Sequence, residues 1–224
     1  MITFQVVDPE YGPKAYQTHA EFTATNQAVL PRTREQFLGL VSEGLVWAAI
    51  DEDQLAGLCY SRFVPDKNEW EIGGLMVLER AREKGIGSVL MLLTLGHLLF
   101  YQDPLAAEPR PTILAHVLKR NPMPRGIIEN ALKFHLAKSD KFSPEGLEGL
   151  PVEEDGFVHG DEYHISIPES LRALAAFADQ WSNKLPKGHE AEVEMFEGTT
   201  LRLWAEAFRE MEETLVSRRN VQAI

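Results

Sequence analysis

The sequence is poor in cysteine, in long apolar runs and in positive charge. Cys59 is the only cysteine among 224 residues, so no disulfide can form within the chain, which fits a reducing compartment. The first ten residues, MITFQVVDPE, lack the basic and apolar segments of a signal peptide. The longest apolar run, residues 89–101, falls short of the roughly 20 residues that a membrane-spanning helix needs. These features predict a cytoplasmic protein that does not cross a membrane.

Positive charge is scarce relative to negative charge. Lys and Arg number 22 against 34 Asp and Glu, which gives a formal net charge of −12. Such a field repels nucleic acid and anionic membranes, so we expect neither as a partner. It mildly favours a cationic substrate or partner.

The order of the predicted elements indicates a sheet flanked by helices. Residues 2–8 alternate weakly and predict a first strand, and residues 33–44 predict a helix with a Thr33–Gln36 capping box. Three apolar runs, 45–51, 55–64 and 70–78, are separated by the polar turns DEDQ and PDKN, which predicts an antiparallel meander. A helix follows over residues 87–103, and it is apolar nearly all round, so we expect it to be buried.

The second half predicts a strand over 112–118, an amphipathic helix over 125–138 and a last strand over 157–167. Beyond these, two apolar stripes at helical spacing predict two helices, the second of which carries Trp204 and Phe208. We therefore divide the chain into a domain of residues 1–168 and a helical extension of residues 169–224.

The stretch ERAREKGIGSVLMLL, residues 79–93, joins the meander to the buried helix. A strand end, a turn with two glycines and a helix start bring free backbone N–H groups and a positive helix dipole to one point, which favours an anion such as phosphate. A P-loop would need a lysine before Ser88, and a dinucleotide fingerprint would need a small residue in place of Leu90. Neither motif fits.

The run Arg82-Glu83-Lys84-Gly85-Ile86-Gly87 resembles the Gln/Arg-x-x-Gly-x-Gly/Ala signature of the GNAT superfamily of acyl-CoA N-acyltransferases. The order of elements over residues 2–167 is also similar to that of the family. The resemblance implies an α/β (α+β) fold, with a mixed, mostly antiparallel central sheet flanked by helices and the two-helix C-terminal extension outside it.

The resemblance also implies where acetyl-CoA, or another acyl-CoA, would bind. The backbone from Arg82 to Ser88 would hold the pyrophosphate of the cosubstrate, and the strand end at Met76, Val77 and Leu78 would pair with its pantetheine arm. The family's asparagine would correspond to Asn121 or to Asn130, and we take Asn121 as the cosubstrate contact.

Acid and base candidates follow from the same resemblance. Glu71 lies 82 − 71 = 11 residues before Arg82, where histone-type members carry their base, and strand alternation would put it on one face with Leu75 and Val77. We expect partial burial to raise its pKa, and the competing interpretation is an exposed edge glutamate. His135 stands where many members carry a tyrosine that acts as the general acid, and it could equally be a histidine at the edge of a helix face.

Other polar groups give weaker signals. The run HGDEYH contains four potential metal ligands, but their spacing matches no defined set, so we expect no metal. His116 lies in the middle of a predicted strand and is interpreted as buried, and Cys59 has no neighbour that would activate it as a nucleophile.

Two functions compete at this point. The first is an N-acetyltransferase that uses acetyl-CoA to acylate a primary amine of a small molecule or a protein, by direct attack with acid and base help. The second is a non-catalytic binding or regulatory module that keeps the GNAT fold and uses its C-terminal helices for interaction. The apolar stripes of these helices are also compatible with a homodimer.

Overall fold

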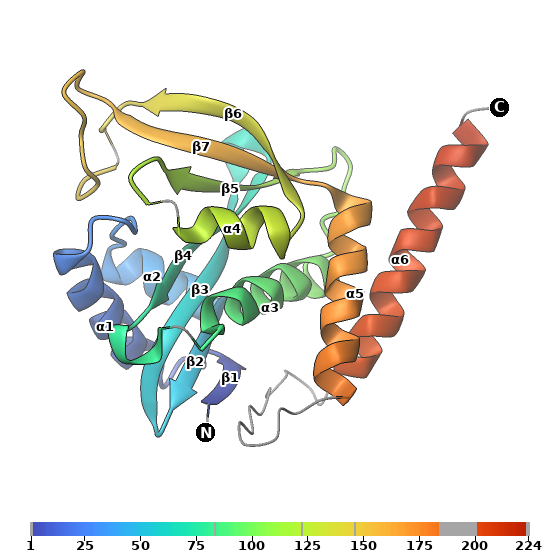
Figure 1. The fold of residues 1–224 in the computed structure, drawn as a ribbon, viewed down its shortest axis with the longest axis horizontal. Coiled ribbons are helices and arrows are strands. Elements are labelled where there is room, and N and C mark those ends of the chain that lie inside the picture. Colours follow the sequence, from blue (N-terminus) through green and yellow to red (C-terminus); the bar gives the residue numbers. More distant parts are fainter. Residues whose placement is uncertain (1, 83, 122, 146, 184–200, 223–224) are drawn as a thin grey trace.

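A computed structural model describes residues 2–82, 84–121, 123–145, 147–183 and 201–222 (Figure 1). The strands are β1 (Ile2–Val6), β2 (Val46–Asp51), β3 (Gln54–Val64), β4 (Glu69–Val77), β5 (Thr112–Leu118), β6 (Phe134–Phe142) and β7 (Val158–Ile165). The helices are α1 (Gly12–Thr25), α2 (Arg34–Ser42), α3 (Ile86–Tyr101), α4 (Met123–Asn130), α5 (Ile167–Asn183) and α6 (Leu201–Gln222), with short 3-10 turns η1 (Pro65–Lys67) and η2 (Glu79–Ala81).

The strands form one seven-stranded sheet in the order β1-β2-β3-β4-β5-β7-β6. Every neighbouring pair is antiparallel except β4 and β5, which run parallel. The predicted meander of β2, β3 and β4 is confirmed, and so is the fold class, a mostly antiparallel mixed sheet flanked by helices. The capping box of α2 is also present, since Thr33 accepts from the Gln36 amide and Gln36 accepts in return from Thr33.

Helices cover both faces of the sheet (Figure 1). One apolar cluster packs α1 and α2 against β2 and β3, and a larger one packs α3, α4, α5 and α6 against the other face. The helix α3 is buried along most of its length because the sheet lies on one side of it and the C-terminal helices lie on the other. Among the described residues, no helix is long and apolar enough to span a membrane.

Both expected C-terminal helices are present and pack on α3. Trp204 is 1% exposed, and its ring would lie 2.4 Å from a Cβ placed on Gly96 of α3, so the glycine makes room for the indole. Leu171 of α5 and Phe208 of α6 belong to the same apolar cluster as α3. The division between residues 168 and 169 stays a prediction, and residues 184–200 lie outside the described part of the chain.

Two elements of the structure differ from the sequence predictions. The helix α1 was not predicted at all. The helix predicted over 125–138 is present only as far as Asn130, where α4 ends, and its second half is wrong because the chain turns through Lys133, at φ 61°, into strand β6. Phe134 therefore starts an edge strand that pairs with β7 at Ile165. The apolar spacing that favoured one long helix combines a short helix and the start of a strand.

Candidate active site

The parallel strands β4 and β5 are paired only at one end. Their register joins Glu69–Glu71 to Thr112–Leu114, and it ends there. Beyond that point β5 pairs with β7 on its other side, so the β5-facing edge of β4 is open from Ile72 onward. The open edge is the feature that pairing with an extended ligand arm requires.

A β-bulge in β4 changes which side chains share a face. The register with β3 shifts between Leu58 and Tyr60, opposite the two glycines of the strand, and Gly74 has φ 63°. A Cβ at Gly74 would lie 1.9 Å from the Tyr60 ring, so only glycine fits there.

The consequence concerns Glu71. Ile72, Leu75 and Val77 all contact the apolar cluster on the α3 side of the sheet, whereas Met76 belongs to the cluster on the α1 side. The expectation that Glu71 shares a face with Leu75 and Val77 is therefore wrong, because the extra bulge residue inverts the alternation between them. Glu71 faces the side of α1 and α2, together with its β3 partner Arg62.

A cavity of about 250 Å³ lies where β4 and β5 separate. Its polar and charged lining side chains are Arg32, Tyr60, Arg62, Lys67, Glu71, His116 and Asn121. Two loops complete the wall, one before α2 with Val29 and Leu30, and one after β6 with Leu147 and Leu150. Met91 of α3 and Ile128 of α4 line the opposite end, so the cavity reaches from one face of the sheet to the other.

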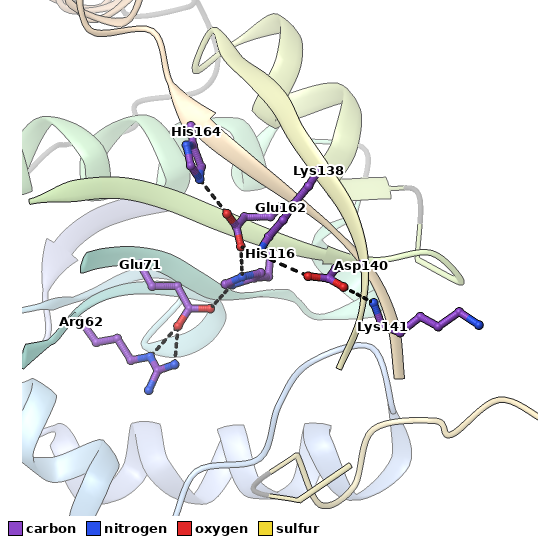
Figure 2. A network of polar contacts seen from close by, with 8 residues as sticks. All are labelled: Arg62, Glu71, His116, Lys138, Asp140, Lys141, Glu162 and His164. Atoms are coloured by element: carbon purple, nitrogen blue, oxygen red, sulfur yellow. Dashed lines mark hydrogen bonds and ion pairs between the residues drawn. The ribbon is translucent and has the colours of Figure 1, made fainter. Parts of the chain in front are cut away.

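A polar network brings Glu71 and His116 together in this cavity (Figure 2). His116 Nδ1 lies 2.9 Å from Glu71 Oε1, and His116 Nε2 lies 3.3 Å from Glu162 Oε2. Arg62 donates from Nε to Glu71 Oε2 at 2.5 Å. Glu162 also contacts His164 Nε2 at 2.7 Å. The consecutive strands β3 and β4 and the more distant strands β5 and β7 thus each supply one or more members.

The charge state of Glu71 differs from the expectation. Burial alone would raise its pKa, but hydrogen bonds and charge from His116 and Arg62 outweigh burial and lower the pKa to about 2. The expected rise toward neutral pH is therefore wrong, since it took no account of these two partners. Glu71 is an anion throughout the physiological range.

His116 responds in the opposite direction. Burial alone would lower its pKa, but Glu71 and Glu162 outweigh burial and raise the pKa above its usual value. The side chain is 31% exposed and lines the cavity, so the expectation of a buried strand histidine is wrong. Glu162 has other cationic partners, among them Lys138 Nζ at 3.2 Å, so it does not depend on His116. A histidine that contacts two carboxylates and faces a cavity is able to take up and return a proton.

The glycine turn begins α3 as the sequence predicts. Gly85 is the N-cap residue at φ 74°, and a Cβ placed there would meet nothing within 4 Å. The amides of Ser88 and Val89 donate to the Gly85 carbonyl within the helix. Amides in the first turn before them have no intrahelical acceptor, so they are suited to bind an anion. Ile86 is buried and holds the turn against the core.

The cations near the turn are held by acidic partners. Arg82 lies 2.6 Å from Glu79, and Lys84 lies 3.2 Å from Asp51. The turn would therefore bind phosphate mainly through its backbone. Glu83, another predicted cosubstrate contact, lies outside the described residues.

The other predicted cosubstrate contacts have different surroundings. Asn121 lines the cavity, whereas Asn130 is exposed at the end of α4. Val77 borders Gly87, since a Cβ at Gly87 would lie 3.6 Å from Val77 Cγ2. Leu78 donates its amide to Ala56 of β3, which fixes the strand end.

His135 does not lie where the prediction required. It is an exposed residue of the edge strand β6, its ring centroid lies 6.2 Å from that of His164, and it is not among the residues that line the cavity. His164 connects to Glu71 only through Glu162 and His116 (Figure 2). The helical position that suggested an acid role for His135 does not exist.

The potential metal ligands of HGDEYH have separate partners. His159 contacts Asp155, Asp161 accepts from Arg125 and Ser139, and Glu162 and His164 belong to the network described above. Within the part of the chain that the structure describes, no group of three or more such side chains is arranged to hold a metal ion.

Sequence reasoning missed His116, Arg62 and Tyr60 as site residues. The available signal was the parallel pairing of the two strands, because it places His116 two residues beyond the partner of Glu71. The sequence alone does not give this register.

Comparisons with known proteins agree with this architecture. Residues 12–99 match the Acetyltransferase (GNAT) family. No curated protein matches the sequence at a significant level.

Several solved structures share the fold. NAA60 of Arabidopsis thaliana, solved with a bisubstrate analogue, is 16% identical with a TM-score of 0.51, over 73% of this chain and 97% of that chain. An N-acetyltransferase from Staphylococcus aureus is 15% identical with a TM-score of 0.54, over 74% and 98%. The putative acetyltransferase yncA from Salmonella typhimurium, solved with its cofactor acetyl-CoA, is 11% identical with a TM-score of 0.54, over 74% and 93%. Residues 12–99 therefore resemble the GNAT acetyltransferases, and the solved structures show that the chain shares their fold.

Proposed function

We propose that the protein is an acetyl-CoA-dependent N-acetyltransferase that acylates a primary amine. The observation that carries the proposal is the Glu71–His116 pair, which lines a cavity at the point where β4 and β5 separate. The glycine turn at the start of α3 supplies an anion site at the far end of the open edge of β4. Solved relatives of the same fold contain acetyl-CoA or a bisubstrate analogue, which supports acetyl-CoA as the cosubstrate.

The cosubstrate would lie along the open edge of β4. The backbone of Arg82, Glu83, Lys84, Gly85, Ile86, Gly87 and Ser88 would bind the pyrophosphate. Met76, Val77 and Leu78 would pair with the pantetheine arm through their main chain, and Asn121 would contact the arm from the end of β5. This arrangement would direct the thioester into the cavity.

The reaction removes two protons from the nitrogen of the ammonium ion and returns one proton to the thiolate. Glu71, with a pKa of about 2, is too weak a base for an ammonium ion, so it holds His116 in position. His116 in its neutral form takes the proton from the attacking ammonium. The amine nitrogen then forms a bond to the thioester carbon, the carbon–sulfur bond breaks, and the imidazolium returns its proton to the leaving thiolate. The nitrogen of the new amide loses its second proton to solvent.

Three predictions from the sequence stay proposals beside the role of His116. Glu71 acting as the direct base through a water molecule predicts activity without His116. His135 acting as the acid predicts a loss of turnover in His135→Ala, although its position on β6 gives no route to the thiolate. A homodimer in the cytoplasm also stays a prediction.

The test combines binding with turnover. Calorimetry with acetyl-CoA measures cosubstrate binding, and thiol release with a panel of primary amines measures transfer. We expect His116→Ala to bind acetyl-CoA with unchanged affinity and to lose about 100-fold or more in kcat, which is the usual contribution of a proton-transfer group. The matched control is His159→Ala, which removes a histidine of β7 that does not line the cavity.

Each outcome has one meaning. Absence of acetyl-CoA binding in the wild type would refute the acyl-CoA proposal. Binding without thiol release on any amine would favour the non-catalytic GNAT module. Full activity of His116→Ala would mean that Glu71 or solvent, and not His116, removes the proton from the amine.

A further inference from the structure

The cavity is basic although the protein is acidic. The basic lining residues Arg32, Arg62 and Lys67, together with His116, stand against a single lining carboxylate, that of Glu71. The whole chain carries a formal net charge of −12. A cleft lined by one sign of charge concentrates ligands of the other sign, so the local excess opposes the average field of the protein. The expectation of a cationic acceptor, based on net charge, does not follow from the cavity itself.

Arg32 is the cation whose position is best defined and whose charge is not neutralised by a cavity carboxylate. Its Nε donates to the Tyr60 hydroxyl at 2.9 Å, and its guanidinium carbon lies 5.5 Å from the centroid of the same ring. Tyr60 is 1% exposed and packs against Gly74, so it holds Arg32 in a fixed place. The terminal guanidinium nitrogens present the planar pair of donors that suits a carboxylate.

Arg62 differs because it is already paired. It lies 2.5 Å from Glu71 Oε2, and the two charges cancel within the cavity. Lys67 lies at the exposed rim, in the turn between β3 and β4. The net positive charge that an acceptor would meet is therefore that of Arg32, supplemented by Lys67.

The distance between Arg32 and the Glu71–His116 pair sets the size of the acceptor. Tyr60, which holds Arg32, and Arg62, which holds Glu71, are two residues apart on strand β3. Alternate residues of a strand share a face and are about 7 Å apart, which a chain of a few carbon atoms spans. An amine at His116 and an anion at Arg32 fit in one small molecule.

We propose that the acceptor is a small primary amine that also carries a carboxylate, with the carboxylate bound by Arg32 and the amine facing His116. This inference rests on the proposed acetyltransferase function and specifies its substrate class. A small molecule is favoured over a protein chain because the cavity is about 250 Å³ and has apolar loop residues on two sides, Leu30 and Leu147 among them. A polypeptide would have to displace these loops.

Matched pairs of amines test the charge preference. Thiol release from acetyl-CoA is measured with β-alanine against n-propylamine, 4-aminobutanoate against n-butylamine, and phenylalanine against 2-phenylethylamine. A further arm uses short peptides with aspartate or alanine at the N-terminus. We expect the carboxylate-bearing member of at least one pair to have a kcat/KM about tenfold or more above its neutral partner, the usual scale of one charge-assisted pair.

Variants of Arg32 identify the residue responsible. In Arg32→Met the ratio of kcat/KM between the carboxylate-bearing amine and its neutral partner should fall toward one, mainly through KM. Arg32→Lys should keep part of the preference because the charge is retained. A purely structural role of Arg32 would lower the rates of both members of a pair equally and leave their ratio unchanged. Arg34→Met makes the same chemical change on an exposed residue that does not line the cavity, and it should keep the wild-type ratio.

The outcomes separate the two proposals. Thiol release with equal kcat/KM for both members of every pair would overturn the acceptor class alone. A ratio unchanged in Arg32→Met would overturn the role of Arg32, and peptides preferred over every small amine would overturn the small-molecule acceptor. Acetyl-CoA binding with no thiol release from any amine would overturn the proposed function and, with it, this inference.

Discussion

Replacing Glu71 with glutamine removes one charge from the cavity with little change in shape. The carboxylate of Glu71 raises the pKa of His116, so the pKa of His116 should fall in the variant. Neutral imidazole would then be present at lower pH than in the wild type. We expect the acid limb of the kcat/KM profile to move to lower pH, with a lower plateau because the glutamine orients the ring less firmly.

The magnitude follows from the pKa of Glu71. It drops from 4.5 to about 2 in the folded protein, a difference of about 2.5 pH units, which corresponds to roughly 3 kcal/mol. Because the folded pKa is the lower one, this stabilisation is present above pH 4.5 and is lost as the pH falls through about 2. The neutral amide can still accept a hydrogen bond from Arg62. We therefore expect the variant to lose about 1–3 kcal/mol of unfolding free energy at pH 7.

Urea unfolding at pH 7 measures the stability, and thiol release between pH 5 and pH 9 measures the profile. The matched control is Glu69→Gln, which makes the same change on the same strand at a residue that does not line the cavity. An unchanged acid limb together with an unchanged urea midpoint in Glu71→Gln would show that the carboxylate and the imidazole are not coupled, and it would refute the assigned roles.

Three further predictions concern the turn, the bulge and acid stability. Gly85→Ala should weaken acetyl-CoA binding measured by calorimetry and lower the free energy of unfolding by about 1 kcal/mol. The control is Gly44→Ala, at the similar φ of 70°, which should lower the free energy of unfolding by about the same amount and leave binding unchanged. Gly74→Ala should lower the unfolding free energy by more than about 2 kcal/mol, because its Cβ would lie 1.9 Å from a buried tyrosine ring; a normal melting temperature would contradict this. Burial lowers the pKa of His19 and of His97 from 6.5 to about 4 in the folded protein. Between pH 6.5 and pH 4 the unfolded state therefore binds more protons than the folded state, so the free energy of unfolding should rise with pH across this range. The rise should be up to roughly 3 kcal/mol for each histidine. Urea titrations at a series of pH values check this, and a flat profile would contradict it.

Local patterns were sufficient for the meander and for the start of α3. Short polar turns between β-rich runs predict hairpins, and glycines between a strand and an apolar helix predict a backbone anion site. Both depend only on neighbouring residues, so no knowledge of distant contacts was needed. The distance from Arg82 back to Glu71 then led to a residue of β4 that lines the cavity.

Long-range contacts explain what the sequence could not provide. The pKa of Glu71 depends on Arg62 from β3 and His116 from β5, which only the folded sheet brings together. The bulge at Gly74 could not be placed either, because two adjacent glycines are equally compatible with a regular strand. The exposed edge strand that contains His135 has no apolar alternation, since few of its residues are buried, so a helical spacing was matched by chance.

The C-terminal helices bear on the choice between the two functions. An interaction module would need the apolar stripes of these helices to be free, but the structure uses much of them on α3: Trp204 is 1% exposed against Gly96, and Phe208 is fully buried. The same contacts hold α3, whose N-terminus forms the glycine turn, firmly against the sheet. An anion site built from backbone amides needs such a fixed helix, because the amides must keep a common direction. The extension therefore supports the helix that begins at the glycine turn, and much of its apolar surface is already covered.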